Sequence, residues 1–158
     1  MIEKLKEMLE MQRVLDANIY ETHGVEYDEE KTYMALFDEL GELNHELKPT
    51  WCWWKKTVKP LDREKVLEEL VDVWHFALSI FYHKDWEINE SYFDMKFIMT
   101  NAKRTNFLEL YDFIMSLSQL SLVAVVILTY HLGFTFDDVY EAYKLKNQIN
   151  FERLSRGY

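Results

Sequence analysis

Apolar residues recur every three or four positions along most of the chain, which is the period at which a helix buries one face. Between Val71 and Phe81 apolar residues point almost all round, so the helix that carries them is predicted to be central and buried. The stretches with a helical pattern are residues 1–22, 28–48, 62–84, 107–132 and, starting near Thr135 or Asp137, a last one to about Phe151.

Residues that start or stop helices separate these stretches. Gly24 favours the left-handed conformation that ends a helix, and Pro49 cannot continue one. Asp62 is a good N-cap residue for the helix that follows it. Residues 51–60 are therefore predicted to be a connection, and residues 85–106 a loop with a short helix.

The fold class that follows is all-α, a helical bundle in a single domain of residues 1–158. A chain of 158 residues is long enough for one domain with a sizeable core. Only 4 Gly and 2 Pro are present, which argues against sandwiches and barrels that need frequent turns. A hydrophobic content of 49% argues against disorder.

Charge and cysteine content narrow the function. The 28 acidic and 18 basic residues give a net charge of −10, which argues against unaided nucleic-acid binding. A nucleotide still fits if divalent cations bridge the like charges. A single cysteine, Cys52, excludes an internal disulfide and a thiolate-rich zinc site. The apolar run Leu120–Leu132 is too short to span a membrane, so we expect a buried helix in a cytoplasmic protein with no membrane partner.

Two pairs of acidic residues three positions apart are the main candidates for chemistry. Glu39 and Glu42 lie on one predicted helix, Glu69 and Asp72 on another, and this spacing places each pair on one helix face. Such pairs usually face solvent. Here, however, Glu69 and Asp72 lie on the helix predicted to be buried, where an unpaired carboxylate is costly. If the two helices pack antiparallel, four carboxylates meet in a site suited to Mg²⁺ or Mn²⁺.

A di-iron site is the competing metal hypothesis. Glu42 with His45 and Asp72 with His75 have the acid-x-x-His spacing of di-iron helical bundles. Such bundles take one more Glu from each of two further helices, and residues 107–132 offer no obvious inward Glu. His45 is expected to face solvent, whereas His75 fits a core histidine as well as a functional one.

The C-terminal region and the tryptophan-rich connection supply candidate substrate contacts. Lys146, Asn150 and Arg153 share one helix face, and Lys and Arg suit phosphate oxygens. In the connection, Trp51, Trp53 and Trp54 could stack on a base, and Lys55 could reach a phosphate. Tryptophans in a connection are as often part of the core.

Together, these segments resemble the dimeric all-α dUTPases, which belong to the all-α NTP pyrophosphatase superfamily with the MazG-like enzymes. The resemblance runs in order along nearly the whole chain. It is carried by Met8-Leu-Glu-Met-Gln12-Arg-Val-Leu15-Asp16, Glu39-Leu-Gly-Glu42, Glu69-Leu-Val-Asp72-Val-Trp-His75-Phe, and Lys146-Asn-Gln-Ile-Asn150-Phe-Glu-Arg153 with Gly157-Tyr158. Asp16 stands where some members carry Asn.

The resemblance implies Mg²⁺-dependent hydrolysis of dUTP to dUMP and pyrophosphate, which limits uracil incorporation into DNA. The metal ligands it implies are Glu39, Glu42, Glu69 and Asp72, with Glu42 also the general base. It assigns phosphates to Lys55, Lys146, Arg153 and Tyr158, the deoxyribose to Asn150, and the uracil region to Gln12, Trp54 and His75. Family members are dimers, so we expect a homodimer, with residues 120–132 supplying apolar surface for it.

Two further hypotheses stay open beside the dUTPase and the di-iron protein. A MazG-like pyrophosphatase would act on another nucleotide or on several, and substrate profiling separates it from a dUTPase. A structural or regulatory helical dimer would leave its carboxylates in solvent and hydrolyse no nucleotide.

Overall fold

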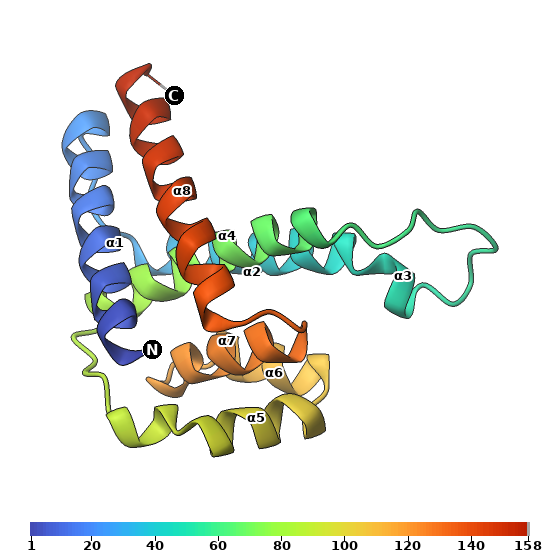
Figure 1. Cartoon of the computed structure of the whole chain (residues 1–158). Coiled ribbons are helices and arrows are strands. Elements are labelled where there is room, and N and C mark those ends of the chain that lie inside the picture. Colours follow the sequence, from blue (N-terminus) through green and yellow to red (C-terminus); the bar gives the residue numbers. More distant parts are fainter. Residues whose placement is uncertain (158) are drawn as a thin grey trace.

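The computed structural model describes residues 1–157, which form helices and no strand (Figure 1), so the all-α prediction is confirmed. Tyr158, predicted to contact phosphate, lies outside the described residues. The elements are α1 (Ile2–His23), α2 (Glu29–Glu46), α3 (Lys48–Trp51), α4 (Arg63–His83), the short 3₁₀ helix η1 (Glu90–Phe93), α5 (Met95–Arg104), α6 (Phe107–Met115), α7 (Leu120–His131) and α8 (Phe136–Ser155).

The long helices pack around α4. Helix α2 runs out to the short α3, and α4 returns beside it, so the two are antiparallel (Figure 1). Helices α1 and α8 pack on each other and on α4, while α5 and α6 pack on α7. Inside the core, Nε1 of Trp74 on α4 donates to Oγ1 of Thr129 on α7 at 3.1 Å. The prediction that residues 62–84 form the central helix is therefore confirmed.

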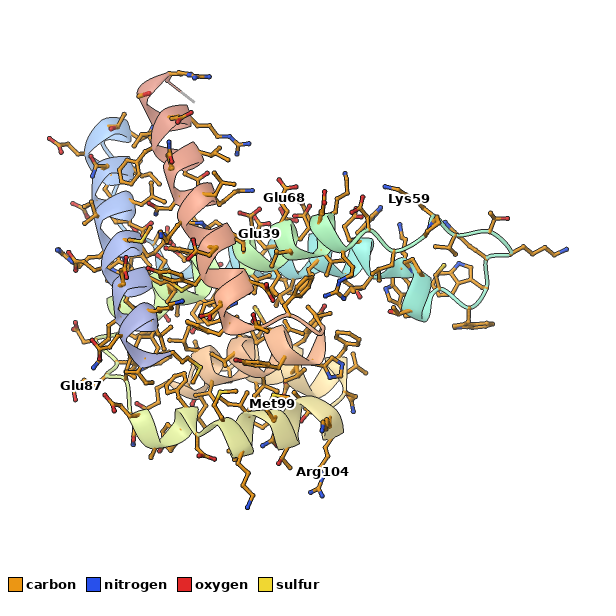
Figure 2. The ribbon with its side chains drawn as sticks, in the orientation of Figure 1. Glu39, Lys59, Glu68, Glu87, Met99 and Arg104 are labelled. Carbon is orange, nitrogen blue, oxygen red and sulfur yellow. The ribbon has the colours of Figure 1, made fainter. Side chains whose placement is uncertain are left out.

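The connection between α3 and α4 extends away from the packed helices (Figures 1 and 2). It carries Lys59, labelled in Figure 2, and the exposed Trp53 and Trp54. Only Cys52 in this region is buried, beside the partly buried Trp51.

The predicted helix over residues 107–132 is in fact two helices, α6 and α7, with a break at residues 116–119. Ser116 has an extended backbone, and its Oγ donates to the carbonyl of Phe113 at 2.6 Å. The Oγ of Ser118 accepts from the amide of Leu120 at 3.2 Å. These serine side chains bind backbone groups that a continuous helix would otherwise pair, which explains the break.

Helix α8 runs to Ser155, four residues beyond the predicted end. No helix-breaking residue occurs before Gly157, whose φ of 79° is left-handed. Residues 85–106 contain η1 and α5, in agreement with the predicted loop and short helix.

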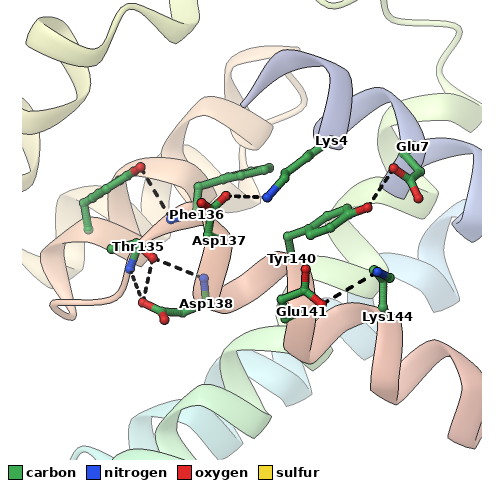
Figure 3. A network of polar contacts seen from close by, with 10 residues as sticks. Lys4, Glu7, Thr135, Phe136, Asp137, Asp138, Tyr140, Glu141 and Lys144 are labelled. Atoms are coloured by element: carbon green, nitrogen blue, oxygen red, sulfur yellow. Dashed lines mark hydrogen bonds and ion pairs between the residues drawn. The ribbon is translucent and has the colours of Figure 1, made fainter.

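Helix α8 is fixed against α1 by polar contacts near its beginning (Figure 3). Thr135 starts α8 with a capping box. In the first turn, Asp137 accepts from Nζ of Lys4 at 2.8 Å, and about one turn later the OH of Tyr140 donates to Glu7 at 2.7 Å. These contacts join the first turns of α8 to α1.

Helix α7 does not supply the expected dimer surface, because Ser121 to Thr129 are all buried within the chain. That expectation was wrong, since an all-apolar helix can cover its whole surface with its own neighbours, here α4, α5, α6 and α8. None of the helices in residues 1–157 meets by itself the length and hydropathy needed for a membrane span; α7 and α8 do so only together, at a bend of 108°.

Candidate active site

Three of the predicted metal ligands meet where α2 packs against α4. The i, i+3 spacing turns Glu69 and Asp72 to one face of α4, and antiparallel packing brings Glu39 of α2 opposite them. One carboxylate oxygen of each lies within 4.8 Å of the other two. Figure 2 labels Glu39 near this junction, where α8 crosses the pair of helices.

The three carboxylates are partly buried and repel one another. Burial, followed by the charge of Asp72, raises the pKa of Glu39 to about 7. Burial, followed by the charge of Glu42, raises the pKa of Glu69 to about 7 as well. Burial also raises the pKa of Asp72. A half-buried group of three acids is unfavourable on its own, and a cation removes the repulsion.

Glu42 lies beside this group but is not one of the three that meet within 4.8 Å. It is exposed, and with Glu69 it lines an open hollow of about 320 Å³. Its charge is the largest electrostatic contribution to the raised pKa of Glu69. Glu42 therefore faces the same space as the carboxylate group, from its solvent side.

Lys146 on α8 closes the other side of the group. Its Nζ donates to Oδ2 of Asp72 at 2.7 Å and lies 3.7 Å from Oε1 of Glu68. Only 15% of the Lys146 side chain is exposed, so this cation is held in place. Arg153, two turns further along α8, lowers the pKa of Asp72 through its charge. Asn150 lies between them and is half-buried.

The tryptophan-rich connection reaches the site only at its edge. Lys55 is exposed and lines a hollow with Lys48, His45 and Glu46. The last two residues also line the hollow that contains Glu42. Trp54 is 57% exposed, and its ring contacts those of Trp51 and Trp53.

The donor set fits a hard divalent cation. Carboxylate oxygens are the ligands that Mg²⁺ and Mn²⁺ prefer, and the group contains no histidine or cysteine among the described residues. His45 is exposed, as predicted, and contacts Lys48. Glu109 on α6 is exposed and caps its own helix. The described residues therefore place neither the histidine ligands nor the further glutamate of a di-iron site at this carboxylate group.

A family model described as dUTPase matches residues 4–158. The chain belongs to the dUTPase family. The resemblance predicted from the sequence is thereby confirmed, and the enzyme is a dUTP diphosphatase. No curated protein matches the chain. dUTPases generally use a divalent metal, and the group of three carboxylates is the candidate place for it.

A buried polar layer of this dUTPase lies between α1, α4 and α8. Oε1 of Gln12 is 2.7 Å from Nδ1 of His75 and 2.7 Å from the OH of Tyr143. The rings of His75 and Tyr143 stack at 4.3 Å. Gln12 and His75, predicted for the uracil region, are thus brought together. The amide oxygen of Gln12 already hydrogen-bonds to both His75 and Tyr143.

Sequence reasoning missed Tyr143, Asn147 and Glu68. Tyr143 and Asn147 are one turn apart, and Asn150 follows them on the same inward side of α8. That spacing could have identified them, because residues four apart share a helix face. Glu68 has the same signal, since it lies four residues before Asp72 on α4, although its ion pair with Lys146 joins different helices.

Proposed function

We propose that the enzyme hydrolyses dUTP to dUMP and pyrophosphate in a Mg²⁺-dependent reaction, with Mn²⁺ able to substitute. This activity would limit uracil incorporation into DNA. The observation that carries the proposal is the group formed by Glu39, Glu69 and Asp72, with raised pKa values and a lysine beside it. Bound there, the metal would neutralise triphosphate charge and make a water more acidic.

The residues of the chain divide the remaining work. Glu42 accepts the proton of the attacking water, because it is exposed at the rim of the carboxylate group and faces the open hollow. Lys146 exchanges Asp72 for a phosphate oxygen when the nucleotide binds, since both partners are anionic. Lys55, Arg153 and Tyr158 complete the phosphate contacts.

The nucleoside lies toward α1 and α8 in this proposal. Asn150 contacts the deoxyribose, because it is half-buried one turn beyond Lys146. Gln12, His75 and Trp54 form the uracil region, of which the first two already belong to one buried layer.

We also propose a single domain of residues 1–158 that forms a homodimer. One continuous core supports the single domain. Met34 and Phe37 support the dimer, because these apolar side chains on α2 are 63% and 62% exposed, one turn apart. A cytoplasmic location stays a prediction from the sequence.

The test is pyrophosphate release from dUTP, dTTP, dCTP and UTP with Mg²⁺, for the wild type, Glu42→Gln and Glu26→Gln. Glu26 is exposed in the loop between α1 and α2 and is not one of the predicted site residues, so its variant controls for loss of one surface charge. We expect release from dUTP in the wild type and in Glu26→Gln, and a loss of at least a hundredfold in Glu42→Gln, as for removal of a general base. Comparable release from several nucleotides would instead indicate the MazG-like specificity, and no release would contradict the proposal.

A further inference from the structure

One member of the group of three carboxylates, Asp72, already has a cation on it. Nζ of Lys146 donates to Oδ2 of Asp72 at 2.7 Å, and only 15% and 18% of the two side chains are exposed. Burial raises the pKa of Asp72, whereas the hydrogen bond and the charge of Lys146 oppose that rise because both stabilise the ionised form. Lys146 is therefore the counter-ion of Asp72 in the protein without metal.

This ion pair opposes a divalent cation at the same group. An ammonium at hydrogen-bond distance from Asp72 repels any cation that shares that carboxylate. The repulsion is weakly screened by salt, because both members of the ion pair are largely shielded from solvent. Metal affinity is therefore lower while Lys146 stays on Asp72, and it rises when the ammonium moves away.

Glu68 offers Lys146 a second acceptor outside the group of three carboxylates. It lies four residues before Asp72 on the same face of α4, and its Oε1 is 3.7 Å from Nζ of Lys146, just beyond hydrogen-bond distance. Glu68 and Lys146 also line a hollow of about 250 Å³ between α4 and α8, which is not the hollow that contains Glu42. A lysine side chain is flexible, so a small rotation carries the ammonium from Asp72 to Glu68.

We propose that Lys146 competes with the metal for Asp72, and that Glu68 is a positioning residue that receives Lys146 when Asp72 is released. The inference rests on the proposed function, in which the metal binds at this group and a phosphate attracts Lys146. Nucleotide and metal then strengthen each other's binding through the displacement of Lys146, in addition to any direct contact between them. Because binding free energies are linked, this effect is reciprocal.

The first test measures Mn²⁺ binding without nucleotide, by the loss of the EPR signal of the free ion. We expect Lys146→Gln to bind Mn²⁺ about tenfold more tightly than the wild type, the low end of what an adjacent opposite charge does to the proton affinity of a carboxylate. The matched control is Lys144→Gln, which removes an exposed lysine of the same helix and should behave as the wild type. Glu69→Gln should weaken binding, which identifies the site. Unchanged or weaker binding in Lys146→Gln would overturn the proposal, as would Mn²⁺ binding that Glu69→Gln leaves unchanged.

The second test is a double-mutant cycle between Glu68 and Lys146 with the same Mn²⁺ assay. Glu68→Gln should weaken Mn²⁺ binding more than its control Glu64→Gln, because Lys146 then has only Asp72 to bind. Glu64 is exposed one turn earlier on α4 and lines the same hollow. In the Lys146→Gln background, the effect of Glu68→Gln should fall to that of Glu64→Gln. Equal weakening in both backgrounds would show that Glu68 acts only through its own charge, and would refute its positioning role.

The third test adds α,β-imido-dUTP, in which an N–H group replaces the oxygen that hydrolysis releases. We expect this analogue to tighten Mn²⁺ binding by a factor about tenfold larger in the wild type than in Lys146→Gln, and equal factors would contradict the coupling. The first two tests use no nucleotide, so they still decide the competition if the wild type hydrolyses no dUTP. Conversely, dUTP hydrolysis with unchanged Mn²⁺ affinity in Lys146→Gln would refute this inference alone.

A measurement on the wild type covers the case in which Lys146→Gln does not fold. ¹⁵N NMR of lysine-labelled protein detects ammonium groups held in ion pairs, and Asp72→Asn assigns the signal of Lys146. We expect Mg²⁺ to shift that signal in the absence of nucleotide, because the ion and the ammonium compete for Asp72. A signal that stays in place while Mg²⁺ binds would overturn the proposal.

Discussion

Removing one carboxylate from the three-acid group should stabilise the metal-free protein at alkaline pH. Glu69 has its pKa raised from 4.5 to about 7 by burial and by its acidic neighbours. The folded protein therefore binds this proton more tightly than the unfolded chain. Stability is present below pH 4.5 and is lost as pH rises through 7, so the ionised group opposes folding at pH 8.

The magnitude follows from the size of the shift. At about 1.36 kcal/mol per pKa unit, a fully buried carboxyl would oppose folding by roughly 3 kcal/mol. Glu69 is half-buried, and solvent screening reduces this to about 1 kcal/mol. Glu69→Gln keeps the shape of the side chain and removes its charge. It also removes repulsion on Glu39, because the charge of Glu69 contributes to the raised pKa of Glu39. The expected gain at pH 8 is about 1–2 kcal/mol, or some 2–6 °C in Tm.

The assay is urea unfolding followed by tryptophan fluorescence in EDTA, at pH 5 and pH 8, for the wild type, Glu69→Gln and Glu26→Gln. Glu69→Gln should exceed the wild type at pH 8 and approach it at pH 5, while Glu26→Gln should follow the wild type. Added Mg²⁺ should reverse the order, because the variant lacks one of the proposed metal ligands. A Glu69→Gln protein no more stable than the wild type at pH 8 in EDTA would show that the group is not strained.

Two other predictions concern the core and the buried layer. Thr129→Val keeps the volume but leaves Nε1 of Trp74 without an acceptor, so we expect a loss of about 1–3 kcal/mol in urea unfolding, and a loss below 0.5 kcal/mol would contradict the pairing. His75 has its pKa lowered to about 3, so as pH falls below 6.5 the unfolded chain binds a proton that the folded ring does not, and stability declines. His75→Gln should therefore flatten the decline in stability between pH 6.5 and pH 4, and an unchanged slope would refute the buried neutral ring.

Local patterns were enough to predict the helices and the carboxylate pairs. The i, i+3 spacing of Glu69 and Asp72 already fixes that both face one side of α4, whatever packs against them. The break at residues 116–119 could not be seen in the same way. It arises because serine hydroxyls hydrogen-bond to backbone groups in place of the helical backbone partners. The spacing of apolar residues carries no information on such bonds.

Contacts between distant residues were beyond reach of the sequence alone. Gln12 and His75 are 63 positions apart, and only the packing of α1 on α4 shows that they share a hydrogen bond. The family resemblance placed both in the uracil region but gave no reason for Asp16. The structure supplies one. The carboxylate of Asp16 accepts from the Gln12 NH₂ group, so the oxygen of the same amide lies toward His75.

The contact between α4 and α8 joins the two halves of the candidate site. On α4, Asp72 and His75 are three residues apart, so one helix presents a carboxylate to the metal group and an imidazole to the buried layer. On α8, Tyr143 and Lys146 are also three residues apart. Lys146 forms an ion pair with Asp72, and the ring of Tyr143 stacks on that of His75. A shift of α8 along α4 would therefore disturb both at once. The ion pair and hydrogen bond between the start of α8 and α1 therefore bear on the Lys146–Asp72 ion pair and the His75–Tyr143 stack together.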